Sequence, residues 1–252
     1  MQEEPMPLVR ALLGALVGLL CGGGLNLVIY RLPRSRPLFR RPRCTGCGRP
    51  LSWEAIPLAG YLLQRGRCRH CGERIPRSFP LVEGLTALVF GALAGRLGWT
   101  PLAALYGVFA LALILTLFLD WLHRDIYYLI LLPATALALL APFLRIDPRL
   151  QVRNALLGLG VGLLFFGVLF LLGRTLFRTA ALALGDVWLA GMIGAMAEFR
   201  AALLTLAAGI LLAALGAGWL LLLRKSAPGD YMPYGAYLCL ATLGFLALWA
   251  PL

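Results

Sequence analysis

Two aspartates stand in or beside long apolar stretches, where a carboxylate is costly to keep. Asp186 lies within the apolar run 180–197, and Asp120 directly follows the run 101–119. An ionised carboxylate at the centre of a membrane costs roughly 2.5 to 3.5 kcal/mol even on insertion scales, so such residues usually serve a function. Two shielded carboxylates share one proton, so one can accept a proton from water while the other donates to an amide carbonyl oxygen. If the fold brings them together, the pair predicts aspartyl protease chemistry.

Four cysteines form two closely spaced pairs in the polar part of the chain. Cys44 and Cys47 make the first pair, Cys68 and Cys71 make the second, and 20 residues separate the pairs. Each pair can place two thiolates on one tight turn, and two such turns complete a tetrahedral zinc site. Disulfides are the alternative, but a cytoplasmic loop is kept reduced. We predict a structural zinc ion that folds the loop, because four cysteine ligands leave no open position for catalysis.

The composition indicates an integral membrane protein. Of the 252 residues, 61% are hydrophobic and only 13% are charged, against roughly 25% charged in soluble domains. A helix of about 20 residues spans the hydrocarbon layer. Eight apolar runs approach this length and predict an all-α polytopic membrane protein: 11–30, 81–97, 101–119, 126–144, 155–173, 180–197, 201–223 and 235–252.

The polar segment 31–80 sets the expected topology. It carries 12 of the 23 basic residues and only two acids, so the positive-inside rule makes it cytoplasmic. Eight alternating spans then place 17 basic residues inside and six outside, with Asp120 and Asp186 facing the same side. This topology explains most of the net charge of +12, because basic residues gather on the cytoplasmic side. The same basic residues can also contact membrane lipids. We predict no nucleic-acid partner.

These patterns divide the chain into three parts. We predict an N-terminal transmembrane helix at 1–30, a cytoplasmic four-cysteine zinc-binding loop at 31–80 and a membrane-embedded aspartyl peptidase domain at 81–252.

Other polar residues have simpler interpretations. Asn26 follows three glycines in the first run and is expected to serve helix packing rather than catalysis. Glu83 is expected to be a first-turn acid that complements a helix N-terminus. Asp125 competes with Asp120, but it lies nearer the loop, where we expect a neighbouring basic residue to pair with it. Cys239 in the last run has no identifiable partner.

Four motifs follow one another along nearly the whole chain. They are the glycine-rich segment 22–33, the double cysteine pair with the segment 79–83 after it, Asp120 with His123-Arg124, and Leu184-Gly185-Asp186-Val187 with Gly194-Ala195 downstream. Together they resemble the prepilin leader peptidases, the type IV prepilin-like peptidase and N-methyltransferase family of bacterial membranes.

The resemblance implies a membrane aspartyl endopeptidase of the Gly-x-Gly-Asp kind, with Asp120 and Asp186 as the catalytic pair. Its implied substrates are prepilins or pseudopilins, whose short basic leader would be removed at the cytoplasmic face of the bacterial inner membrane. In family members that carry the cysteine loop, it also implies N-methylation of the new N-terminus with S-adenosylmethionine. No residue in the sequence indicates where this cofactor binds.

Three positions depart from the family pattern. Ala183 stands at the first glycine of Gly-x-Gly-Asp, and Trp188 stands where a lysine usually follows the second acid. The segment 126–128 reads Ile-Tyr-Tyr, where the family usually has Ile-Pro-Asp or Ile-Pro-Asn. None of these changes removes an essential acid, so we expect an active enzyme.

Two functions of other classes remain open from the residues alone. A non-enzymatic assembly protein, or an inactive relative, would use the zinc loop for docking and the two acids for structure. A proton-coupled transporter would use the acids as a relay. Conservative replacement of either acid by asparagine separates these functions, because only a protease loses leader cleavage.

Overall fold

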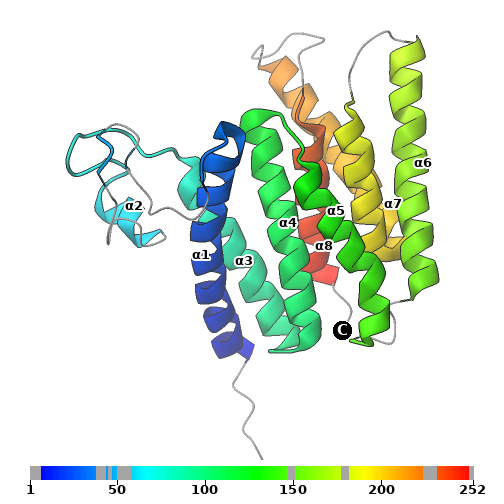
Figure 1. Cartoon of the computed structure of the whole chain (residues 1–252), viewed down its shortest axis with the longest axis horizontal. Helices are drawn as coiled ribbons and strands as arrows, with labels where there is room; N and C mark the ends of the chain where they lie inside the picture. Colours follow the sequence, from blue (N-terminus) through cyan, green and yellow to red (C-terminus); the bar gives the residue numbers. More distant parts are fainter. Residues whose placement is uncertain are drawn as a thin grey trace, which may run out of the picture. The chain divides into compact units, whose positions relative to one another are not determined.

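The computed structural model of the protein describes residues 7–37, 44, 47–49, 58–146, 151–176, 182–223 and 232–249. Within these residues the regular secondary structure is helical, and one isolated antiparallel bridge joins Arg67 and Arg74 (Figure 1). The elements are α1 (Pro7–Arg31), the 3-10 helix η1 (Leu32–Arg34), α2 (Ala59–Leu63), α3 (Ser78–Leu97), α4 (Pro101–His123), α5 (Tyr128–Leu140), the 3-10 helix η3 (Ala141–Leu144), α6 (Val152–Leu176), α7 (Leu184–Leu222) and α8 (Tyr234–Trp249).

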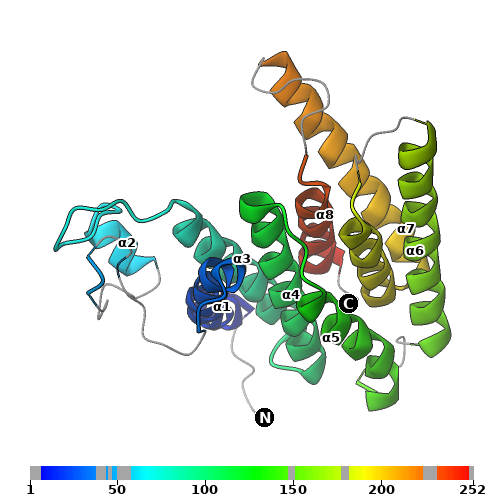
Figure 2. The same cartoon turned by 45° about the horizontal axis from the view of Figure 1, so that its top comes forward.

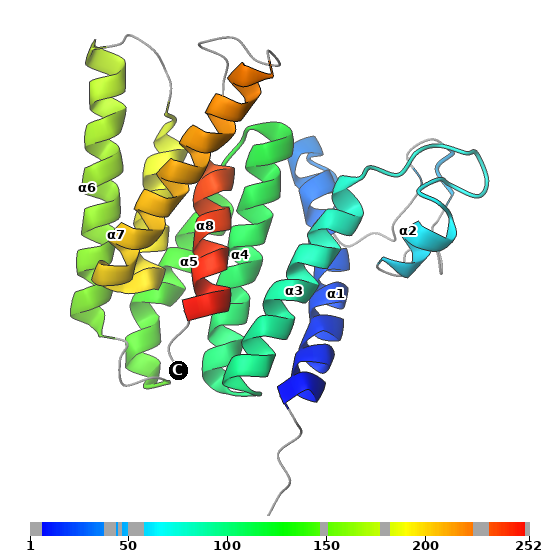
Figure 3. The same cartoon turned by 180° about the vertical axis from the view of Figure 1, so that it is seen from behind.

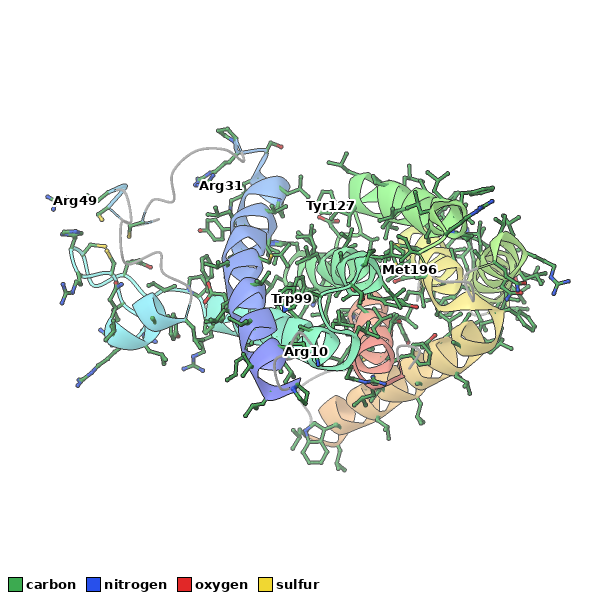
Figure 4. All side chains as sticks on the ribbon, turned by 90° about the horizontal axis from the view of Figure 1, so that it is seen from below. Arg10, Arg31, Arg49, Trp99, Tyr127 and Met196 are labelled. Carbon is green, nitrogen blue, oxygen red and sulfur yellow. The ribbon has the colours of Figure 1, made fainter. Side chains whose placement is uncertain are left out.

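The predicted all-α polytopic membrane fold is confirmed. Among the described residues, five helices are long and apolar enough to cross a membrane: Pro7–Arg34, Ser78–Leu97, Pro101–His123, Val152–Thr175 and Ala201–Trp219. Three shorter apolar helices accompany them: Tyr128–Leu144, Leu184–Ala197 and Tyr234–Leu248. Together these match the eight apolar runs of the sequence, with ends that differ by a few residues. Arg10 and Arg31 lie near opposite ends of α1, where charged side chains can reach the two membrane surfaces (Figure 4).

The sixth and seventh predicted runs belong to one continuous helix, α7. Figures 1 and 2 show that this helix bends sharply into two arms, coloured yellow and orange. The arms correspond to the apolar stretches Leu184–Ala197 and Ala201–Trp219. The bend allows a helix of 39 residues to cross the apolar layer twice, since that length far exceeds the roughly 20 residues of one crossing.

The chain forms two compact units, Met1–Phe118 with Ala250–Leu252 and Leu119–Trp249. In the second unit, α6 packs on the first arm of α7, and α8 lies beside the second arm (Figure 3). A Cβ atom at Gly209 would lie 2.6 Å from the side chain of Leu238, which shows how closely that second arm approaches α8. Both predicted catalytic acids belong to this unit.

In the first unit, α1 packs against α3 through a row of small residues (Figure 3). Gly14, Gly18 and Gly22 are spaced four residues apart and are buried on one face of α1. A Cβ atom at Gly18 would lie 2.5 Å from the carbonyl oxygen of Thr86. Such backbone contact is a common way for helices to associate in lipid, where the hydrophobic effect does not drive them together. Gly22 makes the same kind of contact, whereas a Cβ atom at Gly24 would have no other atom within 4 Å.

We predict that Gly18→Ala destabilises the protein, because the new methyl group has no room against the backbone of α3. Overpacking of this kind typically costs about 1 to 3 kcal/mol. Gly24→Ala is the matched control on the same helix, and it should leave the melting temperature unchanged or slightly raised, since alanine favours helix. Thermal unfolding of both variants in the same detergent measures the difference. Equal melting temperatures for the two variants would contradict the proposed close packing.

Candidate active site and metal site

Asp120 lies in the last turn of α4 and is completely buried, with 0% of its surface exposed. Its Oδ2 atom accepts a hydrogen bond of 2.8 Å from the backbone N–H of Ala236, in the first turn of α8. Residues 120 and 236 are far apart in sequence, so this bond joins the end of α4 to the start of α8. The carboxylate is thereby supplied with a donor that the sequence did not reveal.

Asp186 lies in the first turn of α7 and is 2% exposed. Its Oδ2 accepts a 2.8 Å hydrogen bond from the backbone N–H of Ala183, and its own N–H donates to the Ala183 carbonyl oxygen at 3.0 Å. This exchange resembles the half of a capping box in which an acid in the first turn satisfies the N–H that precedes the helix. The Asp186 carboxylate thus fixes the position of the residue that precedes α7.

The first turn of α8 brings the two acids into one neighbourhood. While the Ala236 N–H donates to Asp120, the backbone amide of the preceding residue, Gly235, interacts with the Asp186 carboxylate. Cys239, one turn further along α8 and fully buried, interacts electrostatically with both acids. Sequence reasoning found no partner for Cys239, because only the tertiary structure places it beside them.

The surroundings of the acids are apolar and closely packed. Leu119 and Leu189 are completely buried, and a Cβ atom at Gly185 would lie 2.9 Å from Ile126. The Oδ1 atom of Asp186 is buried and accepts no hydrogen bond from the residues that the structure describes. This oxygen can therefore bind a water molecule or a substrate group without displacing a protein donor.

Two of the three departures from the family pattern are in contact with each other. The rings of Tyr128, at the start of α5, and Trp188, in the first turns of α7, meet edge to face with 6.4 Å between their centroids. Both rings are partly exposed. An aromatic pair therefore occupies the positions where the family usually has a lysine and an aspartate or asparagine.

The third departure, Ala183, has a simple explanation. Ala183 contributes its backbone N–H and carbonyl group to Asp186, and it is not among the described residues with a positive φ. A position that needs no positive φ accepts alanine as readily as glycine. The substitution therefore leaves the contacts of Asp186 in place.

Asp125 lies on the connection between α4 and α5 and is exposed, unlike Asp120. Burial and the nearby charge of Asp125 raise the pKa of Tyr127. The expected pairing of Asp125 with a neighbouring basic residue stays a prediction. Its exposure makes Asp125 a useful control for the buried acids.

The four predicted zinc ligands converge in the first unit. The sulfur atoms of Cys44, Cys47, Cys68 and Cys71 all lie within 4.8 Å of one another, and the Cys44 and Cys71 sulfurs are 3.6 Å apart. A tetrahedral zinc ion with bonds of about 2.3 Å to sulfur requires sulfur atoms about 3.8 Å apart. The donor set and its spacing therefore fit zinc.

The two cysteine pairs make matching backbone hydrogen bonds. The N–H of Cys44 donates to the Arg49 carbonyl and that of Cys68 to the Glu73 carbonyl, at 2.9 and 2.8 Å. A glycine with positive φ, Gly48 or Gly72, follows the second cysteine of each pair and donates its N–H back to the first. Only glycine adopts this conformation freely. A glycine directly after each pair is thus a further sequence signal of the site, which the prediction from cysteine spacing did not use.

The crowding of thiols also affects their protonation. The backbone amide of Glu73 lowers the pKa of the Cys71 thiol, but desolvation and the thiols of Cys44, Cys68 and Cys47 outweigh this effect and raise the pKa to about 12. Zinc binds the thiolate form, so loading of the site must release protons.

Glu83 occupies a different position from the one predicted. It is not in the first turn of α3, where no acid is found, but lies further inside the helix and is buried. Its Oε1 accepts a 2.9 Å hydrogen bond from Asn26 of α1, and its Oε2 accepts a 2.6 Å bond from the N–H of Leu58. The prediction that Glu83 complements a helix N-terminus is therefore wrong, because tertiary partners satisfy the carboxylate. The packing role expected for Asn26 is confirmed.

Comparison with known proteins assigns both parts of the chain to one family. Residues 16–97 match the bacterial peptidase A24 N-terminal domain, and residues 107–218 match the type IV leader peptidase family. The chain belongs to the type IV leader peptidase family. The resemblance inferred from the motifs is thus confirmed.

Several relatives carry the name prepilin leader peptidase/N-methyltransferase. The one from Myxococcus xanthus is 38% identical over 190 residues, which are 74% of this chain and 56% of that protein. The one from Pseudomonas aeruginosa is 30% identical over 96% of this chain and 91% of its own length, and the one from Pseudomonas putida is 30% identical over 94% and 90%. No solved structure matches the chain.

We predict that Cys44→Ser lowers the zinc content of the purified protein from about one ion per chain to a small fraction, because three thiolates no longer complete the tetrahedral site. Cys21→Ser in α1 is the matched control and should retain zinc, since Cys21 lies outside the cluster. Elemental analysis of both variants after dialysis provides the measurement. Full zinc content in Cys44→Ser would contradict the four-cysteine site.

Proposed function

We propose that this chain is a membrane aspartyl endopeptidase that removes the leader peptide of type IV prepilins or pseudopilins, with Asp120 and Asp186 as its catalytic pair. The observation that carries the proposal is the burial of both carboxylates in helices that the first turn of α8 contacts, α4 through the Ala236 N–H on Asp120 and α7 through Gly235 against Leu189. Membership of the type IV leader peptidase family supports the proposed substrate class.

The two carboxylates can divide the chemistry of amide hydrolysis between them. Two acids held close together in an apolar site cannot both ionise cheaply, so one keeps its proton. The ionised acid accepts a proton as a water oxygen attacks the scissile carbonyl carbon, and the neutral acid donates its proton to the carbonyl oxygen. When the tetrahedral intermediate collapses, the C–N bond breaks and the leaving nitrogen receives a proton. The acids return to a shared-proton state.

We place this site at the cytoplasmic face of the bacterial inner membrane. The basic loop 31–80 favours the cytoplasmic side by the positive-inside rule. A substrate with a basic leader followed by an apolar helix would present its cleavage site at this level of the membrane. In this proposal 1–30 is the N-terminal membrane helix, 31–80 the zinc-binding loop and 81–252 the peptidase domain.

The zinc loop suggests a second activity on the same substrate. We propose that the protein also N-methylates the newly exposed N-terminus with S-adenosylmethionine, as the names of its relatives indicate for those proteins. Zinc bound by Cys44, Cys47, Cys68 and Cys71 would have a structural role and hold the loop in shape.

The alternatives lack comparable support. An inactive docking protein would not need two buried carboxylates that accept backbone hydrogen bonds, Asp120 from Ala236 and Asp186 from Ala183. The names of the relatives indicate a peptidase and a methyltransferase, and none of them suggests a proton-coupled transporter. Partners are therefore expected to be prepilin or pseudopilin substrates and membrane lipids.

We predict that Asp120→Asn and Asp186→Asn each lower the leader-cleavage rate by on the order of 100-fold or more, since general acid–base groups contribute at least this much. A type IV prepilin is co-expressed with each variant at matched membrane levels, and the loss of its leader is followed as a size shift. Asp125→Asn is the matched control, because this neighbouring acid is exposed. Cleavage at wild-type rates by either buried-acid variant would overturn the mechanism, and failure of the wild type to cut any prepilin would favour the docking alternative.

A further inference from the structure

The proposed mechanism needs an element that aligns two acids from different helices. Asp120 ends α4, whereas Asp186 begins α7, and 65 residues of chain lie between them. The first turn of α8 approaches both helices: the Ala236 N–H donates to Asp120, and a Cβ atom at Gly235 would lie 3.1 Å from Leu189, three residues after Asp186 in α7.

We propose that the first turn of α8 is the positioning segment of the active site: the Ala236 amide holds Asp120, and the Gly235 backbone packs against Leu189, three residues after Asp186 in α7. The proposal rests on the proposed peptidase function and extends it to residues outside the aspartate motifs. The amides of a first helical turn have no partner within the helix, so they are free to donate to side chains. They also carry the positive end of the helix dipole, which favours an ionised carboxylate.

The atoms packed around Gly235 leave no room for a side chain at this position. A Cβ atom there would lie 2.9 Å from Oδ2 of Asp120, 3.0 Å from Ile126 and 3.1 Å from Leu189. Any side chain would push against the carboxylate itself and against the apolar groups that hold it. Glycine thus allows the backbone to approach the acid, as it does where chains approach a ligand closely.

The remainder of α8 fixes this turn in place. The ring of Tyr237 packs against Trp121, which directly follows Asp120, with 6.2 Å between their centroids. Leu238 fits against Gly209 in the second arm of α7. The turn is therefore anchored to α4 and α7, the two helices that supply the acids, so displacement of α8 would disturb both of them.

The test separates a positioning role from general stability. Gly235→Ala should lower kcat by on the order of 100-fold with KM nearly unchanged, because a small misplacement of catalytic groups has effects of this size. Gly244→Ala in the same helix is the matched control, since no atom lies within 4 Å of its Cβ position. Kinetics are measured on purified full-length protein in detergent with purified prepilin, and the melting temperature is recorded for each variant.

A second pair of variants tests the amide directly. Ala236→Pro removes the N–H that donates to Asp120 and lies in the first turn, where proline is tolerated. Ala236→Gly keeps the N–H and should stay active. The expected result is a loss of kcat in Ala236→Pro at a melting temperature close to that of Ala236→Gly. If Gly235→Ala fails to fold, the comparison of Ala236→Pro with Ala236→Gly still tests the positioning role of the turn.

The outcomes distinguish this inference from the proposed function. Wild-type cleavage together with normal kcat in both Gly235→Ala and Ala236→Pro would overturn the positioning role and leave the peptidase assignment intact. A rise in KM with unchanged kcat would also overturn it, because the turn would then bind substrate instead of aligning the acids. Absence of cleavage by the wild type and by all variants would count against the peptidase function itself.

Discussion

The structure depends on one constraint, the burial of carboxylates in apolar surroundings. Such a group must receive hydrogen bonds, since the cost of leaving a buried charge unsatisfied exceeds that of almost any other defect. Asp120 obtains a donor from α8, Asp186 from the chain before α7, and Glu83 from Asn26 and Leu58. Each acid thereby fixes the position of a chain segment.

The use of backbone donors links the chemistry to the fold. An N–H group carries no charge of its own, so it can satisfy a carboxylate without neutralising it as an arginine or lysine would. In an aspartyl protease this matters, because the pair must keep one negative charge and one exchangeable proton. A backbone donor also has a structural purpose in the first unit. Glu83 accepts a hydrogen bond from the N–H of Leu58, a residue with positive φ that lies between the two cysteine pairs.

Small residues make these contacts possible. Gly18 and Gly22 allow α1 to reach the backbone of α3, and Gly235 allows the start of α8 to reach Asp120. In each case the absent side chain is replaced by direct backbone contact. At these positions glycine matters because it has no side chain and lets another segment approach its backbone. At Gly48 and Gly72, which follow the two cysteine pairs, it matters because it adopts a positive φ.

The sequence by itself determined the helical membrane fold, the four-cysteine cluster and the family, because hydrophobic run length, ligand spacing and local motifs are properties of short stretches. It could not predict the hydrogen-bond partners of Glu83, which lie 25 and 57 residues away in the chain. It also gave no sign that the first turn of α8, with Gly235 and Ala236, lies beside the acids. Those contacts depend on how helices distant in the chain pack. Tertiary structure alone decides which backbone amide meets a buried carboxylate, since every residue other than proline offers the same donor.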